Sequence, residues 1–257
     1  MIDITKAENE FKKYTNTYDI DDPNIQRKIH HSFRVEALSN KIAKSLKLSS
    51  EEIALATLIG LLHDIGRFEQ YKKFHTFSDS KSVDHGSLGA SSLKQDDFIR
   101  NFIENSKYDH LIEIAIFNHN KLHIPNDLSK TEEIFCKIVR DSDKLDIFYE
   151  AENIFWKDEI PEINSLTISK EVKNCFLNKQ IIDKKYRKNK LDGIVGIISF
   201  IFDLNFPISY QILKDANYIN NILGRFSFQN DNTKLEIENI RNLANSYINY
   251  TFGKKEL

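Results

Sequence analysis

The chain has few of the residues that mark turn-rich proteins. Its 257 residues include only 8 glycines and 4 prolines, whereas Lys, Glu, Ile, Leu and Asn are abundant. All-β architectures need many tight turns, so a shortage of glycine and proline disfavours them. Lys, Glu and Leu are good helix formers. The composition therefore predicts a mainly α-helical protein.

Cysteine is also scarce. Only Cys136 and Cys175 are present, far apart in segments with a helical pattern. Two such thiols exclude a disulfide scaffold and a zinc site built from four cysteines, and they suit a reducing compartment. We expect a cytoplasmic protein.

The sequence lacks both a long apolar run and a strong net charge. The first residues, MIDITKAENEFKKY, do not contain the apolar stretch of a signal peptide, and residues 194–202 are much shorter than the roughly 20 apolar residues of a membrane span. Lys and Arg total 36 against 38 Asp and Glu, a formal charge of −2. No global field therefore draws the protein to duplex nucleic acid or to a membrane, and a polyanionic partner must be held locally.

Helical periodicity covers most of the chain. We expect a helix that begins at Ser49 or Ser50 and ends at His63 and Asp64, and further helices in residues 2–14, 24–46, 85–94, 96–105, 109–122, 131–149, 167–188, 191–205, 209–223 and 233–251. Residues 66–84 show no clean period and are expected to form a loop. The sequence shows no sharp domain boundary, so we expect a single domain of residues 1–257 in which the helices of about 160–257 pack on the first part.

Two metal-competent side chains, His63 and Asp64, end the apolar segment TLIGLLHDIGR. Burying an imidazole beside a carboxylate is costly, and a divalent cation compensates for both. The plain alternative is a helix end with Gly66 as its stop. Further candidate ligands with apolar neighbours are spread over other expected helices, which gives the set His31, His63, Asp64, His85, His119 and Asp143.

The order of these residues resembles the HD superfamily of metal-dependent phosphohydrolases. The motifs HSFRV, LLHDIGR and RDSDKLD carry the resemblance, which covers about residues 25–150. It implies an all-α helical bundle in which His31, His63, Asp64 and Asp143 bind a metal ion. Asp141 is the competing choice for the last ligand, and Asp143 is preferred because Ser142 precedes it and Lys144 and Leu145 follow it.

His85 in VDHGSLGA and His119 in FNHNK resemble the additional ligands of the binuclear branch of this family. The resemblance therefore implies two divalent ions, with Asp64 between them and His85 and His119 on the second ion. Imidazole and carboxylate ligands suit Mn, Fe, Co, Ni or Zn better than Mg. His123 also follows His119 at a spacing typical of zinc sites, but Pro125 is expected to end the helix first, which leaves His123 near the surface.

Candidate contacts to substrate are Arg67, Lys121 and Lys144. Arg67 stands where many members of the family have Lys, and a guanidinium there can hold a phosphate. Each lysine has an ordinary surface position as its alternative. The basic segment KKYRKNK at residues 184–190 is interpreted as a solvated helix face, with a lid over substrate phosphates as the alternative.

The resemblance implies hydrolysis of a phosphoester or phosphoanhydride in a small, nucleotide-like substrate, with Asp64, Arg67, Lys121 and Lys144 as the catalytic groups and water as the nucleophile. Residues NKLHIPNDL follow His119 in place of the GYP element of the cyclic-di-GMP-degrading branch, which disfavours that activity. Two alternatives stay open: a diiron oxygenase of the HD type, and a nucleotide sensor without catalysis.

Overall fold

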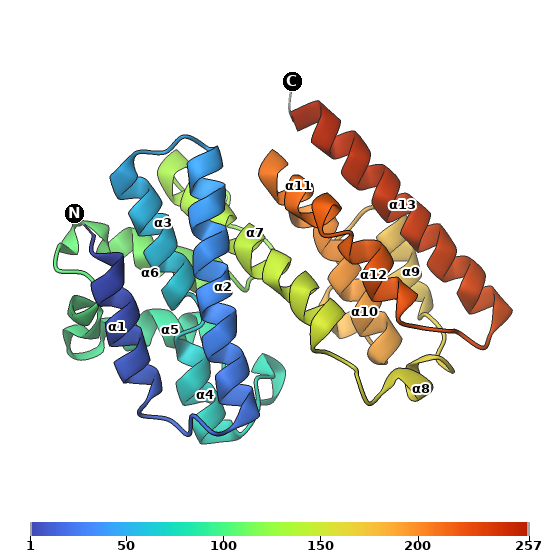
Figure 1. Cartoon of the computed structure of the whole chain (residues 1–257), viewed down its shortest axis with the longest axis horizontal. Helices are drawn as coiled ribbons and strands as arrows, with labels where there is room; N and C mark the ends of the chain where they lie inside the picture. Colours follow the sequence, from blue (N-terminus) through green and yellow to red (C-terminus); the bar gives the residue numbers. More distant parts are fainter. Residues whose placement is uncertain (1, 256–257) are drawn as a thin grey trace. The chain divides into compact units, whose positions relative to one another are not determined.

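The computed structural model describes residues 2–255, and within that range the secondary structure consists of helices without any strand. The prediction of an all-α fold is confirmed. The chain divides into two compact units, residues 1–143 and 144–257, and helix α7 (Lys130–Asn153) begins in the first unit and ends in the second (Figure 1). The expected packing of both parts into a single domain stays a prediction.

The first unit is a bundle of short and medium helices. Its remaining α-helices are α1 (Ile4–Thr15), α2 (Pro23–Ser45), α3 (Ser50–Leu62), α4 (Gly66–Phe74), α5 (His85–Lys94) and α6 (Asp109–Asn118). Helices α2 and α3 run side by side, α1 packs on α3, and α5 packs on both α4 and α6. Apolar side chains from these helices form a buried core that includes Phe11, Val35, Leu58, Phe68 and Ile116.

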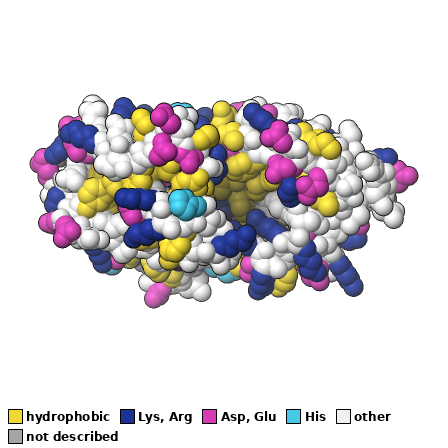
Figure 2. Space-filling view, turned by 90° about the horizontal axis from the view of Figure 1, so that it is seen from below, with side chains coloured by type: hydrophobic (Ala, Val, Ile, Leu, Met, Phe, Trp, Pro, Cys, Tyr) yellow, Lys and Arg dark blue, Asp and Glu magenta, His cyan; other side chains and the backbone are white. Residues whose placement is uncertain are grey.

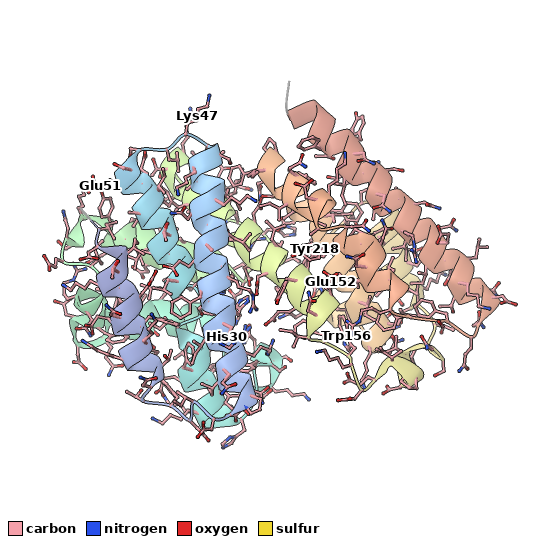
Figure 3. All side chains as sticks on the ribbon, in the orientation of Figure 1. His30, Lys47, Glu51, Glu152, Trp156 and Tyr218 are labelled. Atoms are coloured by element: carbon pink, nitrogen blue, oxygen red, sulfur yellow. The ribbon has the colours of Figure 1, made fainter. Side chains whose placement is uncertain are left out.

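Local sequence explains where α3 begins. The Ser49 hydroxyl and the Glu52 carboxylate cap each other's backbone amides in a capping box, which satisfies donors that the first helical turn leaves unpaired. Lys47 has a left-handed φ of 56° in the turn that separates α2 from α3, where Figure 3 labels it near Glu51. The predicted start at Ser49 or Ser50 is confirmed.

The second unit holds the end of α7 and further helices, namely α8 (Ile160–Ile163), α9 (Lys170–Leu177), α10 (Lys190–Ile198), α11 (Pro207–Asp215), α12 (Tyr218–Gly224) and α13 (Asp231–Lys255). The long helix α13 packs against α9, α11 and α12. The core of this unit contains Phe176, Ile194, Ile198, Leu213, Ile222 and Ile240. Among the helices that the structure describes, none has the length and apolarity to cross a membrane.

The prediction that residues 66–84 form a loop is wrong for the first half of that segment. Residues Gly66–Phe74 are helix α4, and His63 and Ile65 keep helical dihedral angles between α3 and α4. Gly66 has no positive φ, so it does not act as the helix stop that its type suggests. The sequence of α4 shows no clear hydrophobic periodicity because the buried side of this helix includes the polar residues Arg67 and Gln70.

Three expected helices are interrupted in the structure by residues with left-handed dihedral angles. Residues 95–101 form a 3₁₀ segment with left-handed dihedral angles at Asp96 and Asp97. Helix α9 ends at Leu177, and Lys179 has a φ of 56°. Asn217, with a φ of 54°, separates α11 from α12. Asn and Asp tolerate such left-handed conformations, and periodicity alone does not reveal them.

Candidate metal centre

His63 and Asp64 directly follow the most apolar helix of the first unit. All residues from Leu55 to Leu62 are buried, and His63 and Asp64 are only 0% and 2% exposed. The Arg67 amide donates to the Asp64 carbonyl at 2.9 Å, so the backbone stays wound through this point. The doublet therefore lies on a rigid helical segment inside the unit.

Close helix packing brings His85 to the doublet. A Cβ atom on Gly66 would lie 2.5 Å from the Gly89 nitrogen and 2.6 Å from the His85 carbonyl oxygen, distances that real side chains do not reach. Only glycine allows α4 and α5 to approach this closely. His85 is the first residue of α5, and Asp84 caps that helix by accepting from the Ser87 amide at 2.8 Å.

The other candidate ligands come from three more elements of the first unit. His31 lies in the middle of α2, His119 follows the last residue of α6, and Asp143 lies on α7. Both histidines are at most 2% exposed, and the Asp143 side chain is 18% exposed. The structure thus brings together all six residues that the sequence singled out.

Four of these residues form a first group around one oxygen of Asp64. The Asp64 Oδ2 atom lies 3.4 Å from His31 Nε2 and 3.6 Å from His63 Nε2. The two Nε2 atoms are 3.1 Å apart, and Asp143 Oδ1 lies 3.2 Å from His31 Nε2 and 3.7 Å from His63 Nε2.

The other oxygen of Asp64 faces a second pair of imidazoles. Asp64 Oδ1 lies 3.4 Å from His85 Nε2 and 3.5 Å from His119 Nε2, and these two Nε2 atoms are 3.0 Å apart. Asp64 therefore belongs to both groups, with one carboxylate oxygen directed at each pair of imidazoles.

These spacings fit metal coordination. Two ligand atoms that each lie about 2.1 Å from one ion are about 3.0 Å apart at a right angle and about 3.4 Å apart at the tetrahedral angle. The distances within both groups run from 3.0 to 3.7 Å. Four imidazoles and two carboxylates are also the donor types that borderline transition metals prefer.

Hydrogen bonds fix the direction of the imidazole lone pairs. Nδ1 of His63 lies 2.7 Å from the Gly60 carbonyl oxygen, and Nδ1 of His119 lies 2.6 Å from the Ile116 carbonyl oxygen. A carbonyl accepts only, so each Nδ1 carries the proton and each Nε2 presents a lone pair to the cluster. Nδ1 of His85 faces the Asp79 carboxylate at 2.7 Å. The close Nε2 atoms of His85 and His119 thus repel each other unless a cation lies between them.

Burial keeps these groups in the protonation states that bind metals. It lowers the pKa of His63 and brings the pKa of His85 to about 3, so both rings are neutral at neutral pH. Burial alone would raise the pKa of Asp64, but the Lys28 ammonium and neighbouring histidines hold it well below its ordinary value. Burial alone would likewise raise the pKa of Asp143, but contact with His31 and His63 holds it well below its ordinary value.

Sequence reasoning missed Lys28. Its ammonium donates to Asp64 Oδ2 at 2.6 Å, and the residue is only 8% exposed. Lys28 precedes His31 by three positions on α2, so the two share a helix face. This spacing is the feature of the sequence from which Lys28 could have been placed near His31.

Sequence reasoning also missed Asp79. Its carboxylate accepts from His85 Nδ1 at 2.7 Å and pairs with Arg67 at 2.9 Å. A carboxylate behind a ligating histidine fixes the orientation of its ring. Asp79 lies in the segment expected to be a loop, where no pattern predicted its direction.

The predicted substrate contacts have partners in the structure. Arg67 donates through one terminal nitrogen to Gln70, to the Phe77 carbonyl and to Asp79, and its Nε lies 3.5 Å from Asp64 Oδ1. Lys121 pairs with Asp84 at 2.6 Å. In the second unit, Lys144 pairs with Asp203 at 2.9 Å.

Several residues that were weighed as ligands do not join either group. Asp141 is buried but belongs to none of the groups of possible ligand atoms found among residues 2–255. His123 is exposed, as was expected. His30, His75 and His110 likewise belong to none of these groups within residues 2–255.

The basic segment at residues 184–190 forms ion pairs with nearby acids. Lys185 pairs with Asp183 at 3.3 Å, Lys188 with Glu171 at 3.1 Å and Lys190 with Glu162 at 2.6 Å. These lysine side chains are 38% to 65% exposed. These contacts favour the interpretation of residues 184–190 as a solvated surface over that of a lid for substrate phosphates. Basic and acidic side chains also occur together on the face shown in Figure 2.

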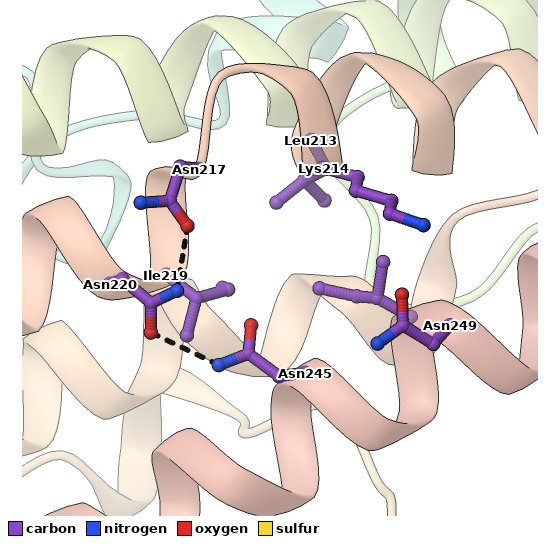
Figure 4. A pocket seen from close by; sticks show the side chains of 8 residues that line it. Leu213, Lys214, Asn217, Ile219, Asn220, Asn245 and Asn249 are labelled. Carbon is purple, nitrogen blue, oxygen red and sulfur yellow. Dashed lines mark hydrogen bonds between the residues drawn. The ribbon is translucent and has the colours of Figure 1, made fainter.

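A pocket of about 350 Å³ lies within the second unit, between α11, α12 and α13 (Figure 4). Asn245 donates to Asn220 at 3.0 Å, and Asn220 donates to Asn217 at 2.6 Å. These amides thus use part of their hydrogen-bonding capacity on one another. Leu213, Ile219 and Ile248 supply the apolar part of the lining.

Comparison with known families identifies the region that holds the candidate ligands. Residues 29–147 match the family model of the HD domain. No curated protein and no solved structure matches the chain. All six candidate ligands, from His31 to Asp143, lie inside the matched range. The chain therefore contains an HD domain in residues 29–147.

Proposed function

We propose that this protein is a metal-dependent phosphohydrolase that cleaves a phosphoester or phosphoanhydride bond of a small, nucleotide-like substrate. The observation that carries the proposal is the position of Asp64, whose two oxygens face separate pairs of imidazoles. In this proposal His31, His63 and Asp143 hold one divalent ion, His85 and His119 hold a second, and Asp64 contacts both.

The donor set limits which ions are expected. Neutral imidazoles with two carboxylates favour Mn, Fe, Co, Ni or Zn over Mg. When bound, such a pair of ions supplies activation of water near neutral pH and neutralises charge on phosphoryl oxygens.

The side chains around Asp64 support an anionic substrate. Lys28 lies 2.6 Å from one carboxylate oxygen, and Arg67 lies 3.5 Å from the other. Both are at most 9% exposed, so their charges act through little water. We propose that Arg67 binds a phosphoryl oxygen and offsets the charge that develops during attack. Lys121 and Lys144 are proposed as further contacts, and each would exchange its aspartate partner for substrate.

The test is a screen of the purified protein, loaded with each of the expected metals, against mono-, di- and triphosphates, cyclic nucleotides and cyclic dinucleotides. We expect phosphate release or diester opening that requires metal and falls by at least about a hundredfold in His63→Ala and Asp64→Ala. His123→Ala is the matched control, because it removes an exposed histidine, and it should keep full activity.

Equal turnover by the His63→Ala, Asp64→Ala and original proteins would refute the proposed mechanism. A mixed-valent diiron spectrum together with oxygen-dependent turnover would instead support the oxygenase alternative. Binding of nucleotides without any turnover would support the sensor.

A further inference from the structure

Three basic side chains meet one aromatic ring next to Asp64. The guanidinium carbon of Arg27 lies 5.5 Å from the ring centre of Phe77, the Lys28 ammonium 5.7 Å, and the guanidinium carbon of Arg67 5.8 Å. Arg27 and Lys28 come from α2, and Arg67 comes from α4. We call these four residues the Phe77 cation cluster.

The ring at the centre of this cluster is held in place. Phe77 stacks on Tyr71 with ring centres 4.8 Å apart and an angle of 26° between the planes. The Tyr71 hydroxyl donates to Asp22 at 3.0 Å, and the Phe77 carbonyl accepts from Arg67 at 2.6 Å. The negative face of an aromatic ring attracts cations, so a fixed ring can keep three like charges close to one another.

Two of these basic side chains pair with carboxylates that also face the histidine groups. Asp64 Oδ2 accepts from Lys28, and Asp79 accepts from both Arg67 and His85. Divalent ions at the histidine groups would add a surplus of positive charge beside Lys28 and Arg67. An anionic ligand with several negative charges complements that surplus.

The cluster also extends beyond the immediate surroundings of Asp64. Lys28 and Arg67 lie within 3.5 Å of Asp64, whereas Arg27 reaches the same ring from the preceding position of α2. An anion that touches all three basic groups is therefore longer than the single phosphoryl group at the histidines.

We propose that the Phe77 cation cluster binds a second phosphoryl group of the substrate, so that the substrate is a phosphoanhydride such as a nucleoside di- or triphosphate. This inference rests on the proposed function. Water adds its oxygen to the phosphorus at the histidine groups, and the P–O bond of the anhydride breaks. The leaving phosphate keeps the bridging oxygen and its electron pair, and the proton lost by water is released to the products or solvent.

The experiment compares the binding of inorganic pyrophosphate and orthophosphate to the Mn-loaded full chain by calorimetry at fixed ionic strength. Metal content is measured before and after, because pyrophosphate chelates metals. We expect pyrophosphate to bind at least about tenfold more tightly. Arg27→Gln should weaken pyrophosphate about tenfold, the size of one charge-assisted hydrogen bond, and should change orthophosphate binding less than about twofold.

Two further variants separate the cluster from general effects of charge and folding. Phe77→Leu keeps an apolar side chain but removes the ring, and it should lower the preference for pyrophosphate as Arg27→Gln does. Lys72→Gln is the matched control, since Lys72 also lies on α4 and sits 5.5 Å from an aromatic ring, that of Tyr18. It removes one positive charge outside the cluster and should leave both affinities unchanged.

Equal binding of the two anions, or an equal loss of both in Arg27→Gln, would overturn the inference. The failure of the proposed function has a different signature. Metal-dependent hydrolysis of monoesters without any preference for pyrophosphate refutes the second phosphoryl site and leaves the proposed function standing. A preference that depends on Arg27, without hydrolysis of any phosphate compound, supports the site and refutes the hydrolase.

Discussion

Asp64 is the residue that both groups of candidate ligands share. Its oxygens face four imidazoles, the Lys28 ammonium and the Arg67 guanidinium, although the residue is only 2% exposed. A buried carboxylate needs such compensation to stay ionised. Lys28, His31 and His63 all face the Oδ2 atom of Asp64. A metal ion bound at this oxygen would therefore share it with the Lys28 ammonium.

Asp79 offers a test of how the ring of His85 is oriented. Asp79→Asn replaces an oxygen that accepts from His85 Nδ1 and removes the negative partner of Arg67. We expect the affinity for one of two bound Mn ions to fall about 10- to 100-fold, the usual effect of losing a carboxylate behind a histidine ligand. Calorimetric titration with Mn measures the affinity for each ion, and metal analysis after dialysis measures how many ions stay bound.

Asp84→Asn is the control for that substitution. Asp84 caps α5 and pairs with Lys121, and asparagine caps helices about as well as aspartate. The affinity for both ions should change less than about threefold. A loss as large as that in Asp79→Asn would mean that local negative charge, and not the contact with His85, determines affinity.

The buried carboxyl of Glu36 should make the stability of the protein depend on pH, independently of metal binding. Burial, followed by the neighbouring Glu8 carboxylate, raises the pKa of Glu36 to about 8, and Lys12 opposes this shift. The folded state binds the proton more tightly than the unfolded chain, whose pKa is 4.5. The contribution of Glu36 to the free energy of unfolding should therefore be largest below about pH 4.5. As the pH rises from there to about 8, this contribution should fall by at most about 5 kcal/mol.

Denaturant unfolding at several pH values measures this slope. Glu36→Gln, which cannot ionise, should flatten it and should be more stable than the original protein at pH 9. Glu8→Gln should flatten it only in part, because burial of Glu36 remains. An unchanged slope in Glu36→Gln would show that other groups cause the pH dependence.

The six candidate ligands could be selected from sequence because the order of their motifs resembles that of the HD superfamily. The sequence HSFRV fixed His31, and RDSDKLD directed the choice to Asp143 over Asp141. Lys28 and Asp79 could not be selected in this way, since their significance depends on contacts between elements far apart in the chain. Lysines and aspartates are common on surfaces, so their type alone does not separate a buried partner of Asp64 or His85 from an ordinary surface charge.

At the scale of helices, packing between α4 and α5 determines whether His85 can join Asp64. We expect Gly66→Ala to separate these helices, because the new Cβ would meet backbone atoms of Gly89 and His85 within 2.6 Å. The free energy of unfolding should fall by about 2 kcal/mol or more, as for other overpacked sites. Mn affinity should fall as well, and both quantities are measured on the same sample.

Gly193→Ala is the matched control. Gly193 lies inside α10, and apart from its chain neighbours and the backbone of its own helix no atom is within 4 Å of a Cβ placed there. Alanine in a helix interior is favoured over glycine by roughly 1 kcal/mol, so this variant should be equally or more stable and should bind Mn normally. Normal Mn binding by Gly66→Ala would show that the cluster does not need the close approach of α4 and α5.

The elements that sequence predicted best are those whose ends carry local signals. The capping signal at Ser49 placed the start of α3 within a residue. Helix α4 was missed because Gly66 has a role in helix packing, and because Arg67 and Gln70 are buried for their hydrogen bonds. Such roles depend on partners in α5 and in residues 77–83, which no local pattern records.

At the scale of the whole molecule, the six residues of the cluster all belong to the first of the two compact units. A ligand that binds only the folded state stabilises it by about 4 kcal/mol at a thousandfold excess over its dissociation constant. Saturation with Mn should therefore slow amide hydrogen exchange in α2, α3, α5 and α6, and leave exchange in α9 to α13 unchanged. Mass spectrometry of exchanged peptides resolves these helices. The same experiment on His63→Ala, which removes a ligand of one of the two ions, should show weaker Mn-dependent protection, and equal protection of both units would place the stabilising ion outside this cluster.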